Sequence, residues 1–226
     1  MERASTPRVI ALKYGETDLP LRMVFFGSHS EEREPISLTL YLVRIGKRNI
    51  LIDAGCDTMP GFQLRHFCGP VEVLRQYGLA PHEITDVIIT HAHHDHIDGI
   101  RHFPHATVWI QADEYEKGKR YIPDGCRLRI YQRSAVVTRD LRIRAIGGHS
   151  VGSSIVLLRH ATDVYVFCGD ECYSPKCLER CIPTGSSHCP QKSRAFIEIY
   201  RQPPYRVLLA HDPNLLPDTN GAATVL

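Results

Sequence analysis

Short apolar runs alternate with glycine, proline and charged residues along most of the chain. Apolar runs that are bounded in this way are typical of β-strands. The pattern predicts strands at residues 36–45, 49–53, 86–90, 106–110, 127–130, 141–144, 155–158, 164–168 and 206–210. Gly46, Lys47 and Arg48 separate the first two, which predicts a hairpin. Upstream, residues 9–12 and 23–26 predict an edge strand and a loop.

The spacing of apolar residues also predicts helices at residues 70–77, 112–117 and 191–200. Gly78 and Gly118 follow the first two, and glycine commonly ends a helix. From Pro213 onward, the sequence pattern predicts a tail. Because helices and strands interleave without a linker or an internal repeat, the pattern predicts one layered α/β domain over residues 1–226, with mixed sheets.

Residues 117–144 are basic, with nine Lys or Arg against only Asp124 and Asp140. Within this stretch, residues 127–130 and 141–144 alternate arginine with apolar residues, which places the arginines on one face of each strand. We interpret these arginines as a solvated strand face, and an anion-binding surface is the alternative.

The composition is ordinary for a folded protein of 226 residues, with 43% hydrophobic and 23% charged residues. A net charge of +2 is too small to indicate a nucleic-acid or membrane partner. No apolar run approaches membrane-spanning length, and Met1–Pro7 lead into no signal-peptide core. We therefore expect a cytoplasmic protein with neither partner, and homodimer formation stays open.

The chain has eight cysteines, which we expect to be free thiols because no export signal is apparent. Five of them lie between residues 168 and 189. A further metal site there is an alternative, and its members are Cys172, Cys177, Cys181, His188 and Cys189. Their irregular spacing favours it less than paired CxxC motifs would.

The strongest chemical signal is the sequence His91-Ala92-His93-His94-Asp95-His96, which follows the strand predicted at 86–90. Ile97–Ile100 then open a helix, so these side chains sit on a strand-to-helix turn and can converge on one point. Imidazole and carboxylate are the ligands of zinc and similar metals. The turn therefore predicts a metal site, and a histidine-rich surface loop is the alternative.

One short turn cannot supply every ligand of a catalytic site, so further donors must come from other loops. His149, Asp170 and His211 each stand where a predicted strand stops, and a rigid sheet can present a ligand at such a position. Asp53 also ends a strand, and there it can orient the metal-binding turn without touching the metal.

The order of these motifs resembles that of the metallo-β-lactamase superfamily, from about residue 36 to residue 212. The resemblance implies an αββα sandwich, in which two mixed β-sheets are flanked by helices and the site lies at the sheet edge. It implies two divalent metal ions, zinc first, with manganese or iron as alternatives. It assigns one ion to His91, His93 and His149 and the other to Asp95, His96 and His211, with Asp170 bridging the two.

Details of the motifs resemble particular branches of the superfamily. His93 stands where the di-iron oxidoreductases have glutamate, and Asp170 stands where many β-lactamases have cysteine. Tyr173, three residues after Asp170, resembles a tyrosine that points into the site of N-acyl homoserine lactonases. The segment Cys172–Pro190 departs from those lactonases because it is rich in cysteine and proline.

We expect a dinuclear-metal hydrolase that activates water and opens a small-molecule ester or lactone, such as an N-acyl homoserine lactone. Asp95 would pass a proton to the leaving alkoxide, and Tyr173 would stabilise the oxyanion. His94 and Asp98, on the same turn, are not expected to be ligands. The alternatives are a thioesterase similar to glyoxalase II, with arginines of 127–144 binding its carboxylates, and a non-catalytic metal-binding relative. A nuclease has less support.

Overall fold

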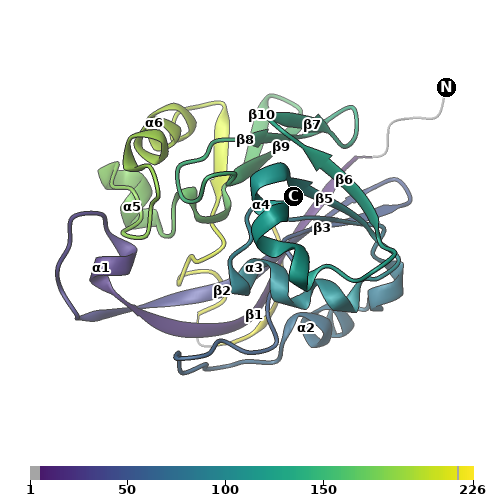
Figure 1. Ribbon diagram of the computed structural model, residues 1–226, viewed down its shortest axis with the longest axis horizontal. Helices are drawn as coiled ribbons and strands as arrows, with labels where there is room; N and C mark the ends of the chain where they lie inside the picture. The colour runs from purple at the N-terminus through teal and green to yellow at the C-terminus, as the bar shows by residue number, and fades with distance from the viewer. Residues whose placement is uncertain (1–5, 218) are drawn as a thin grey trace.

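The computed structural model describes residues 6–217 and 219–226 as two β-sheets packed face to face, with helices on their outer sides (Figure 1). This arrangement confirms the predicted αββα sandwich. The residues from Met1 to Ser5, within the stretch in which we expect no signal peptide, lie outside the described residues. Among the described residues, no helix is long and apolar enough to span a membrane.

The larger sheet has the strand order β12-β1-β2-β3-β4-β5-β6. Its strands are β1 (Arg8–Pro20), β2 (Arg33–Ile45), β3 (Arg48–Ile52), β4 (Asp86–Ile88), β5 (Thr107–Gln111), β6 (Arg127–Tyr131) and β12 (Gly221–Thr224). β3 to β6 are parallel, whereas β12, β1, β2 and β3 pair antiparallel. The prediction of an edge strand at 9–12 was wrong, and so was the tail from Pro213, because β12 returns to pair with β1.

The smaller sheet has the order β11-β10-β9-β8-β7, in which only β10 and β11 are parallel. Its strands are β7 (Ser134–Val136), β8 (Leu141–Ala145), β9 (Ser154–His160), β10 (Asp163–Phe167) and β11 (Tyr205–Leu208). The sequence pattern missed β7. The alternation predicted for 141–144 is confirmed, with Leu141 and Ile143 buried, but at 127–130 it is wrong because Ile130 is 48% exposed.

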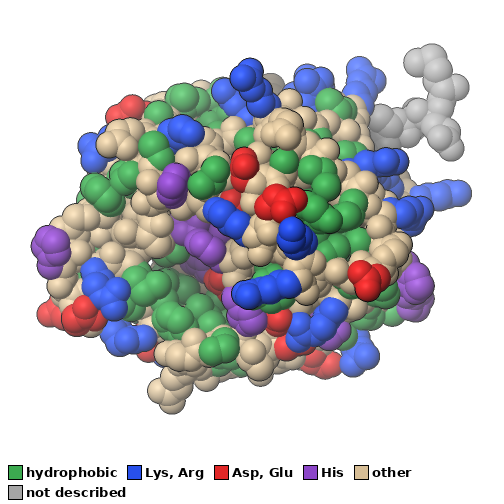
Figure 2. All heavy atoms as spheres, viewed as in Figure 1, with side chains coloured by type: hydrophobic (Ala, Val, Ile, Leu, Met, Phe, Trp, Pro, Cys, Tyr) green, Lys and Arg blue, Asp and Glu red, His purple; other side chains and the backbone are tan. Residues whose placement is uncertain are grey.

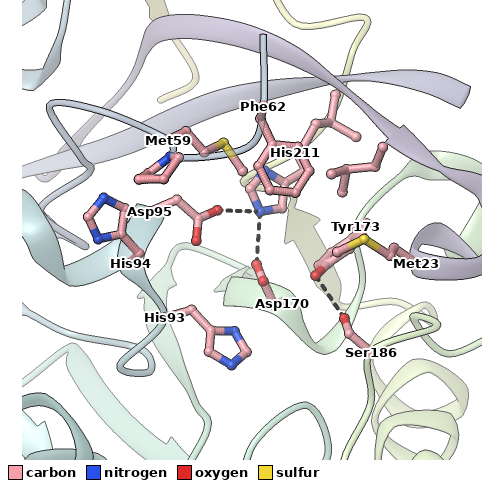
Figure 3. Close-up of a pocket in the computed structure, with 13 residues that line it drawn as sticks. Met23, Met59, Phe62, His93, His94, Asp95, Asp170, Tyr173, Ser186 and His211 are labelled. Atoms are coloured by element: carbon pink, nitrogen blue, oxygen red, sulfur yellow. Dashed lines mark hydrogen bonds and ion pairs between the residues drawn. The ribbon is translucent and has the colours of Figure 1, made fainter. Parts of the chain in front are cut away.

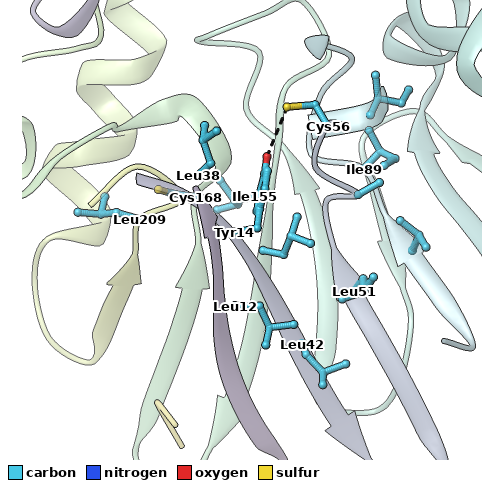
Figure 4. Close-up of a cluster of buried hydrophobic side chains, with 14 of the residues drawn as sticks. Leu12, Tyr14, Leu38, Leu42, Leu51, Cys56, Ile89, Ile155, Cys168 and Leu209 are labelled. Atoms are coloured by element: carbon cyan, nitrogen blue, oxygen red, sulfur yellow. Dashed lines mark hydrogen bonds between the residues drawn. The ribbon is translucent and has the colours of Figure 1, made fainter. Parts of the chain in front are cut away.

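Successive residues of the central strands enter two different cores, because side chains alternate between the faces of a sheet. On β1, Val9 and Ala11 pack between the two sheets, whereas Ile10 and Leu12 face the helix side. Figure 4 shows Leu12 on that side, beside Leu42 and Leu51 of the neighbouring strands. Burial on both faces makes these strands continuous apolar runs and a rigid base for the loops at their ends.

The α-helices are α1 (Leu21–Val24), α2 (Pro70–Gln76), α3 (His94–Ile97), α4 (Ala112–Gly118), α5 (Pro175–Arg180) and α6 (Pro190–Tyr200). Short 3₁₀ helices are η1 (Pro81–Glu83), η2 (Asp98–His102), η3 (Lys119–Tyr121) and η4 (Gly169–Glu171). α2 and α6 lie close to the helices predicted from spacing. α1 replaces part of a predicted loop.

Two helix ends differ from the sequence prediction. Gly118 does not end α4 in a left-handed turn, because the chain continues directly into η3. Glycine leaves room there for a close approach: a Cβ atom would lie 2.6 Å from the end of the Ile97 side chain and 3.0 Å from the Ala92 Cβ. α5 begins inside the segment rich in cysteine and proline, where Pro175 is its first residue and the Ser174 side chain accepts a hydrogen bond from the Cys177 N–H.

Candidate metal centre

All seven predicted donors lie in segments that follow strands, at one edge of the sandwich. His91 and His93 lie between β4 and α3, Asp95 and His96 lie in α3, and the segments after β8, β10 and β11 carry His149, Asp170 and His211, respectively. The fold brings all seven side chains to one place. Two groups of donor atoms form there, and within each group the atoms lie within 4.8 Å of one another.

The first group consists of three imidazoles around one carboxylate oxygen. The Nδ1 atom of His93 lies 3.0 Å from Nε2 of His91 and 2.9 Å from Nε2 of His149. The Oδ2 atom of Asp170 lies 3.4 Å from Nε2 of His91 and 3.3 Å from Nε2 of His149. These four atoms surround a common point and could hold a metal ion.

The second group faces the other oxygen of the same carboxylate. The Oδ1 atom of Asp170 lies 3.0 Å from the Nε2 atoms of both His96 and His211. Asp95 lies across from them, its Oδ2 atom 3.6 Å from His96 Nε2 and 3.7 Å from His211 Nε2 (Figure 3). Asp170 therefore stands between two donor groups, with one oxygen toward each, which is the arrangement of a bridging ligand.

The hydrogen bonding of the site fits a metal. Among the described residues, three buried side-chain polar atoms make no aligned hydrogen bond, and two of them, His96 Nε2 and Asp170 Oδ1, face each other at 3.0 Å. Buried polar atoms without partners are rare and unfavourable, unless an ion completes them. These two atoms belong to the second donor group, so the residues present suit a cation between them.

Each buried histidine offers one ring nitrogen to the donor groups and has its other ring nitrogen beside a protein oxygen. The Nδ1 atom of His211 donates to the Ser37 carbonyl at 2.8 Å, and that of His91 lies 3.1 Å from the Thr90 hydroxyl. The Nδ1 atom of His149 lies 3.4 Å from the Thr184 hydroxyl. Such contacts fix the ring orientation and the tautomer of a metal-ligating histidine.

Asp53 supports the turn, as predicted, without reaching the donor groups. Its backbone is left-handed, with φ at 62°, which sends the side chain across to the β4 end. One oxygen accepts from the N–H of Thr90 at 2.8 Å, and the other accepts from the Thr90 hydroxyl and from His96 Nδ1 at 2.8 Å. This carboxylate therefore holds His96 in place.

Two further buried glutamates hold the ligand-bearing loops, and the sequence pattern missed both. Glu114 accepts from the N–H groups of Ala92 and Gly152 and from the Ser150 hydroxyl, so it ties the His91 turn to the His149 loop. Burial raises the pKa of Glu114, but these hydrogen bonds outweigh burial and the net shift is downward.

Glu171 accepts from the N–H groups of Gly148 and His149 and from the hydroxyls of Ser153 and Ser193. Here burial prevails over the hydrogen bonds and raises the pKa of Glu171. Its position directly after Asp170 is the signal that could have identified it, because η4 turns one carboxylate into the site and the other beneath it.

The two donor groups differ in electrostatics. Desolvation among the packed rings, together with electrostatic repulsion from His91, lowers the pKa of His93 to about 4. Desolvation likewise lowers the pKa of His149. Desolvation also acts on His96 and His211, but nearby carboxylates, Asp170 first, outweigh it and raise the pKa of both. His93 and His149 therefore favour the neutral imidazole, the form that binds metal, whereas His96 and His211 favour the protonated form beside Asp170.

Three other residues of the sequence prediction have clear positions. Tyr173 is buried, and its ring packs edge-on against His211 with centroids 5.0 Å apart. His94 turns away from the donor groups, with Nε2 2.8 Å from the Thr58 carbonyl oxygen. Asp98 accepts from the Asp57 N–H and from Arg101. The last two residues thus have partners outside the donor groups.

All eight cysteines are free, as predicted. The alternative of a second metal site between residues 172 and 189 is not supported by the described part of the chain, where candidate metal-holding groups occur only at the sheet edge. Instead, Cys172 and Cys177 are buried and contact the backbone carbonyls of Ser174 and Val24.

A pocket of about 390 Å³ opens above the donor groups. One side carries His93, Asp95, Asp170, Tyr173 and His211, and the other is lined by apolar residues, namely Leu19, Met23, Ile36, Met59, Pro60 and Phe62. No Lys or Arg is among its lining residues. Figure 2 shows histidine side chains at the base of a hollow, with hydrophobic side chains along its lower side.

The chain matches the family model of the metallo-beta-lactamase superfamily over residues 36–195. Hydroxyacylglutathione hydrolase of Citrobacter koseri is 34% identical over 96 residues, which are 40% of this chain and 34% of that protein. The corresponding enzyme of Salmonella paratyphi A is 32% identical over 96 residues, again 40% of this chain and 34% of that protein. The chain thus spans about a third of the length of the curated relatives it matches.

Solved structures share the fold over nearly the whole chain. A probable metal-dependent hydrolase from Staphylococcus aureus has a TM-score of 0.78 at 20% identity, covering 94% of this chain and 91% of its own. An N-acyl homoserine lactone hydrolase, with N-hexanoyl-L-homoserine at its catalytic metal centre, has a TM-score of 0.79 at 18% identity, covering 92% and 94%. These likenesses, together with the family match, confirm the family and the fold expected from the motifs.

Proposed function

The chain belongs to the metallo-beta-lactamase superfamily, a family of metal-dependent hydrolases, and we propose that it hydrolyses neutral lactones or esters with an apolar acyl group. An N-acyl homoserine lactone is the first candidate substrate. The observation that carries this proposal is the pocket, which joins the donor groups and Tyr173 on one side to an apolar wall without Lys or Arg on the other.

We propose that two divalent ions occupy the site. His91, His93 and His149 would hold one ion, Asp95, His96 and His211 the other, and Asp170 would bridge them. The lack of an aligned hydrogen bond at His96 Nε2 and Asp170 Oδ1 and the two-sided contacts of Asp170 support this assignment. Histidine and carboxylate suit zinc first, with manganese or iron as alternatives. Such ions, when bound, supply Lewis acidity for a carbonyl and lower the pKa of water.

Two side chains of the pocket would act on the substrate directly. Tyr173 lies beside His211 with its hydroxyl toward the pocket, where it can donate a hydrogen bond to the carbonyl oxygen as negative charge develops (Figure 3). Asp95 is less buried than Asp170 and lines the same space, so it can pass a proton to the leaving alkoxide when the ester bond breaks.

The apolar wall supports an acyl-bearing substrate over a multiply charged one. Met23, Met59 and Phe62 are partly exposed toward the pocket and would regain burial against an alkyl chain. A substrate carboxylate or phosphate, in contrast, would enter a space without a cationic side chain to pair with it. This lack of charge compensation favours neutral lactones or esters.

A thioesterase acting on a glutathione conjugate is the second candidate, because hydroxyacylglutathione hydrolases are the curated relatives that match the sequence. Such a substrate carries carboxylates that call for basic residues near the site. None of the arginines of 127–144, which were predicted for that role, lines the pocket, and Arg133, Arg142 and Arg144 line a different hollow. The structure therefore gives this alternative less support.

The free thiols bear on the cellular compartment in which the protein works. Because all eight cysteines are free, we propose that the protein works in a reducing compartment such as the cytoplasm.

The test measures hydrolysis of matched substrates in a pH-stat, with purified protein of known metal content. We expect turnover of an N-hexanoyl or longer homoserine lactone to exceed that of S-lactoylglutathione, with chelation abolishing both. Faster turnover of the glutathione thioester would establish the second candidate. No hydrolysis of either by metal-loaded protein would contradict both.

A further inference from the structure

The segment Ile182–Cys189, which we name the strap, runs along the rim of the pocket. At one end it is anchored to the α1 region, where the Pro183 carbonyl accepts from the Phe26 N–H at 2.8 Å and the Gly185 N–H donates to the Met23 carbonyl at 2.9 Å. The approach is so close that a Cβ on Gly185 would lie 1.8 Å from the Arg22 carbonyl oxygen. Only glycine allows this contact.

At its other end the strap is anchored to the metal-binding loop. The N–H of His188 donates to the His149 carbonyl at 2.9 Å, and the N–H of Cys189 donates to the Gly148 carbonyl at 2.7 Å. Between these anchors, the Ser187 N–H closes a turn on the Thr184 carbonyl at 3.1 Å. Four backbone hydrogen bonds therefore hold the strap at its two ends and a fifth closes the turn inside it, which fixes the backbone on both sides of residue 186.

That side chain is Ser186, and it contacts Tyr173. The two hydroxyl oxygens lie 3.0 Å apart, and both residues line the pocket (Figure 3). The tyrosine ring is held independently by its edge-on packing against His211. Ring packing fixes the position of the hydroxyl but not the direction of its proton, which the Ser186 hydroxyl and the nearby Asp170 carboxylate can both influence.

We propose that Ser186 is a positioning residue, which donates its hydroxyl proton to the Tyr173 oxygen and so directs the phenolic proton into the pocket. A phenol has one proton and two lone pairs, so accepting from Ser186 leaves its proton for the substrate oxygen. Hydrogen bonds in a chain polarise one another, which makes the phenol a stronger donor. The catalytic part of this inference rests on the proposed function of Tyr173.

The experiment compares Ser186→Ala with Ser187→Ala, the matched control one residue along the strap. Ser187 contacts Thr184 and Ser193 and does not contact Tyr173. Metal-loaded protein carrying [¹³Cζ]tyrosine is observed by NMR, and the Tyr173 resonance is identified by its loss in Tyr173→Phe. We expect Ser186→Ala to shift this resonance, whereas Ser187→Ala leaves it in place and Ser186→Thr restores it.

Kinetics of the same variants then test the consequence for turnover. We expect kcat of Ser186→Ala to fall about 10-fold with unchanged metal content and little change in KM, less than the roughly 100-fold or greater loss for Tyr173→Phe. The double variant should be no slower than Tyr173→Phe alone, because both changes act on one hydroxyl.

Two results overturn the proposal. One is an unshifted Tyr173 resonance in Ser186→Ala, and the other is a further 10-fold loss when Ser186→Ala is added to Tyr173→Phe. A parent protein without hydrolytic activity contradicts the proposed function instead, and the NMR comparison then still decides whether Ser186 sets the tyrosine hydroxyl.

Discussion

The two sides of the pocket are built in different ways. On the metal side, the donors follow strands of the two packed sheets, and buried groups hold them from behind: Asp53 holds His96, and the Ser37 carbonyl holds His211. On the substrate side, Met23, Met59 and Phe62 come from a one-turn helix and a loop and are only partly buried.

This difference separates two tasks. A metal centre needs donor atoms placed to within fractions of an ångström, which a supported sheet edge provides. A wall that receives alkyl chains needs apolar area more than exact geometry, and methionine adapts its shape easily. We therefore expect substitutions on the metal side to abolish metal binding and those on the substrate side to change selectivity while leaving the metal in place.

The largest effect is expected from His93→Ala, which removes the donor between His91 and His149. Metal in the first group and hydrolytic activity should be lost together, by more than about 100-fold in kcat/KM, since losing even an outer partner of a metal ligand costs about 10–100-fold. Metal analysis and lactone hydrolysis measure this. His94→Ala is the matched control, because the His94 side chain turns away from the donor groups. Equal losses in both variants would contradict the assignment of His93, and not His94, as a metal ligand.

Tyr173→Phe should lower kcat by roughly 100- to 1,000-fold, the range for removing one oxyanion donor, while both ions stay bound. This residue lies between the metal side and the substrate side of the pocket, so its substitution distinguishes an effect on catalysis from an effect on metal binding. Tyr200→Phe, which removes a hydroxyl that contacts Arg144, controls for the loss of a hydroxyl. Parent-like turnover of Tyr173→Phe would remove tyrosine from the mechanism.

Asp53→Asn should weaken binding of one ion about 10- to 100-fold through His96, because an amide cannot hold the imidazole as a carboxylate does. Chelator competition measures the affinity. Asp57→Asn changes a nearby carboxylate that contacts Arg101 and His102, and it should leave the affinity unchanged. If the two variants bind metal equally well, the hydrogen bond from His96 to Asp53 contributes little to metal affinity.

The smallest effect is expected on the substrate side. Phe62→Ala should raise KM for a decanoyl lactone about 10-fold, because removing apolar contacts changes discrimination by about 1–3 kcal/mol. KM for a butyryl lactone and the metal content should hardly change. Phe26→Ala, an exposed phenylalanine outside this lining, is the control. An equal change in KM for both chain lengths would argue against an acyl-binding wall.

The same division explains what the sequence could predict. Each donor on the metal side stands at or just after an apolar run, so the hydrophobic pattern placed His91, His149, Asp170 and His211 at strand ends. The strap carries no such pattern: Pro183, Gly185 and Ser186 are typical of any loop, and their roles come from contacts with distant segments.

Other features that the sequence did not predict also depend on contacts with distant segments of the chain. Glu114 resembles a surface glutamate in sequence, and only the fold shows that it is buried and accepts several hydrogen bonds. β12 was read as a tail because its four residues, Gly221–Thr224, have weak strand propensity. It forms because β1 offers an unpaired edge.

The most direct test of the central claim is the metal content of the parent protein and of Asp170→Asn, measured by elemental analysis after growth in metal-replete medium. The account predicts two divalent ions per parent chain and loss of both in the variant, because one carboxylate serves both donor groups. A parent chain that is free of divalent metal, or an Asp170→Asn variant that retains two ions, would contradict it.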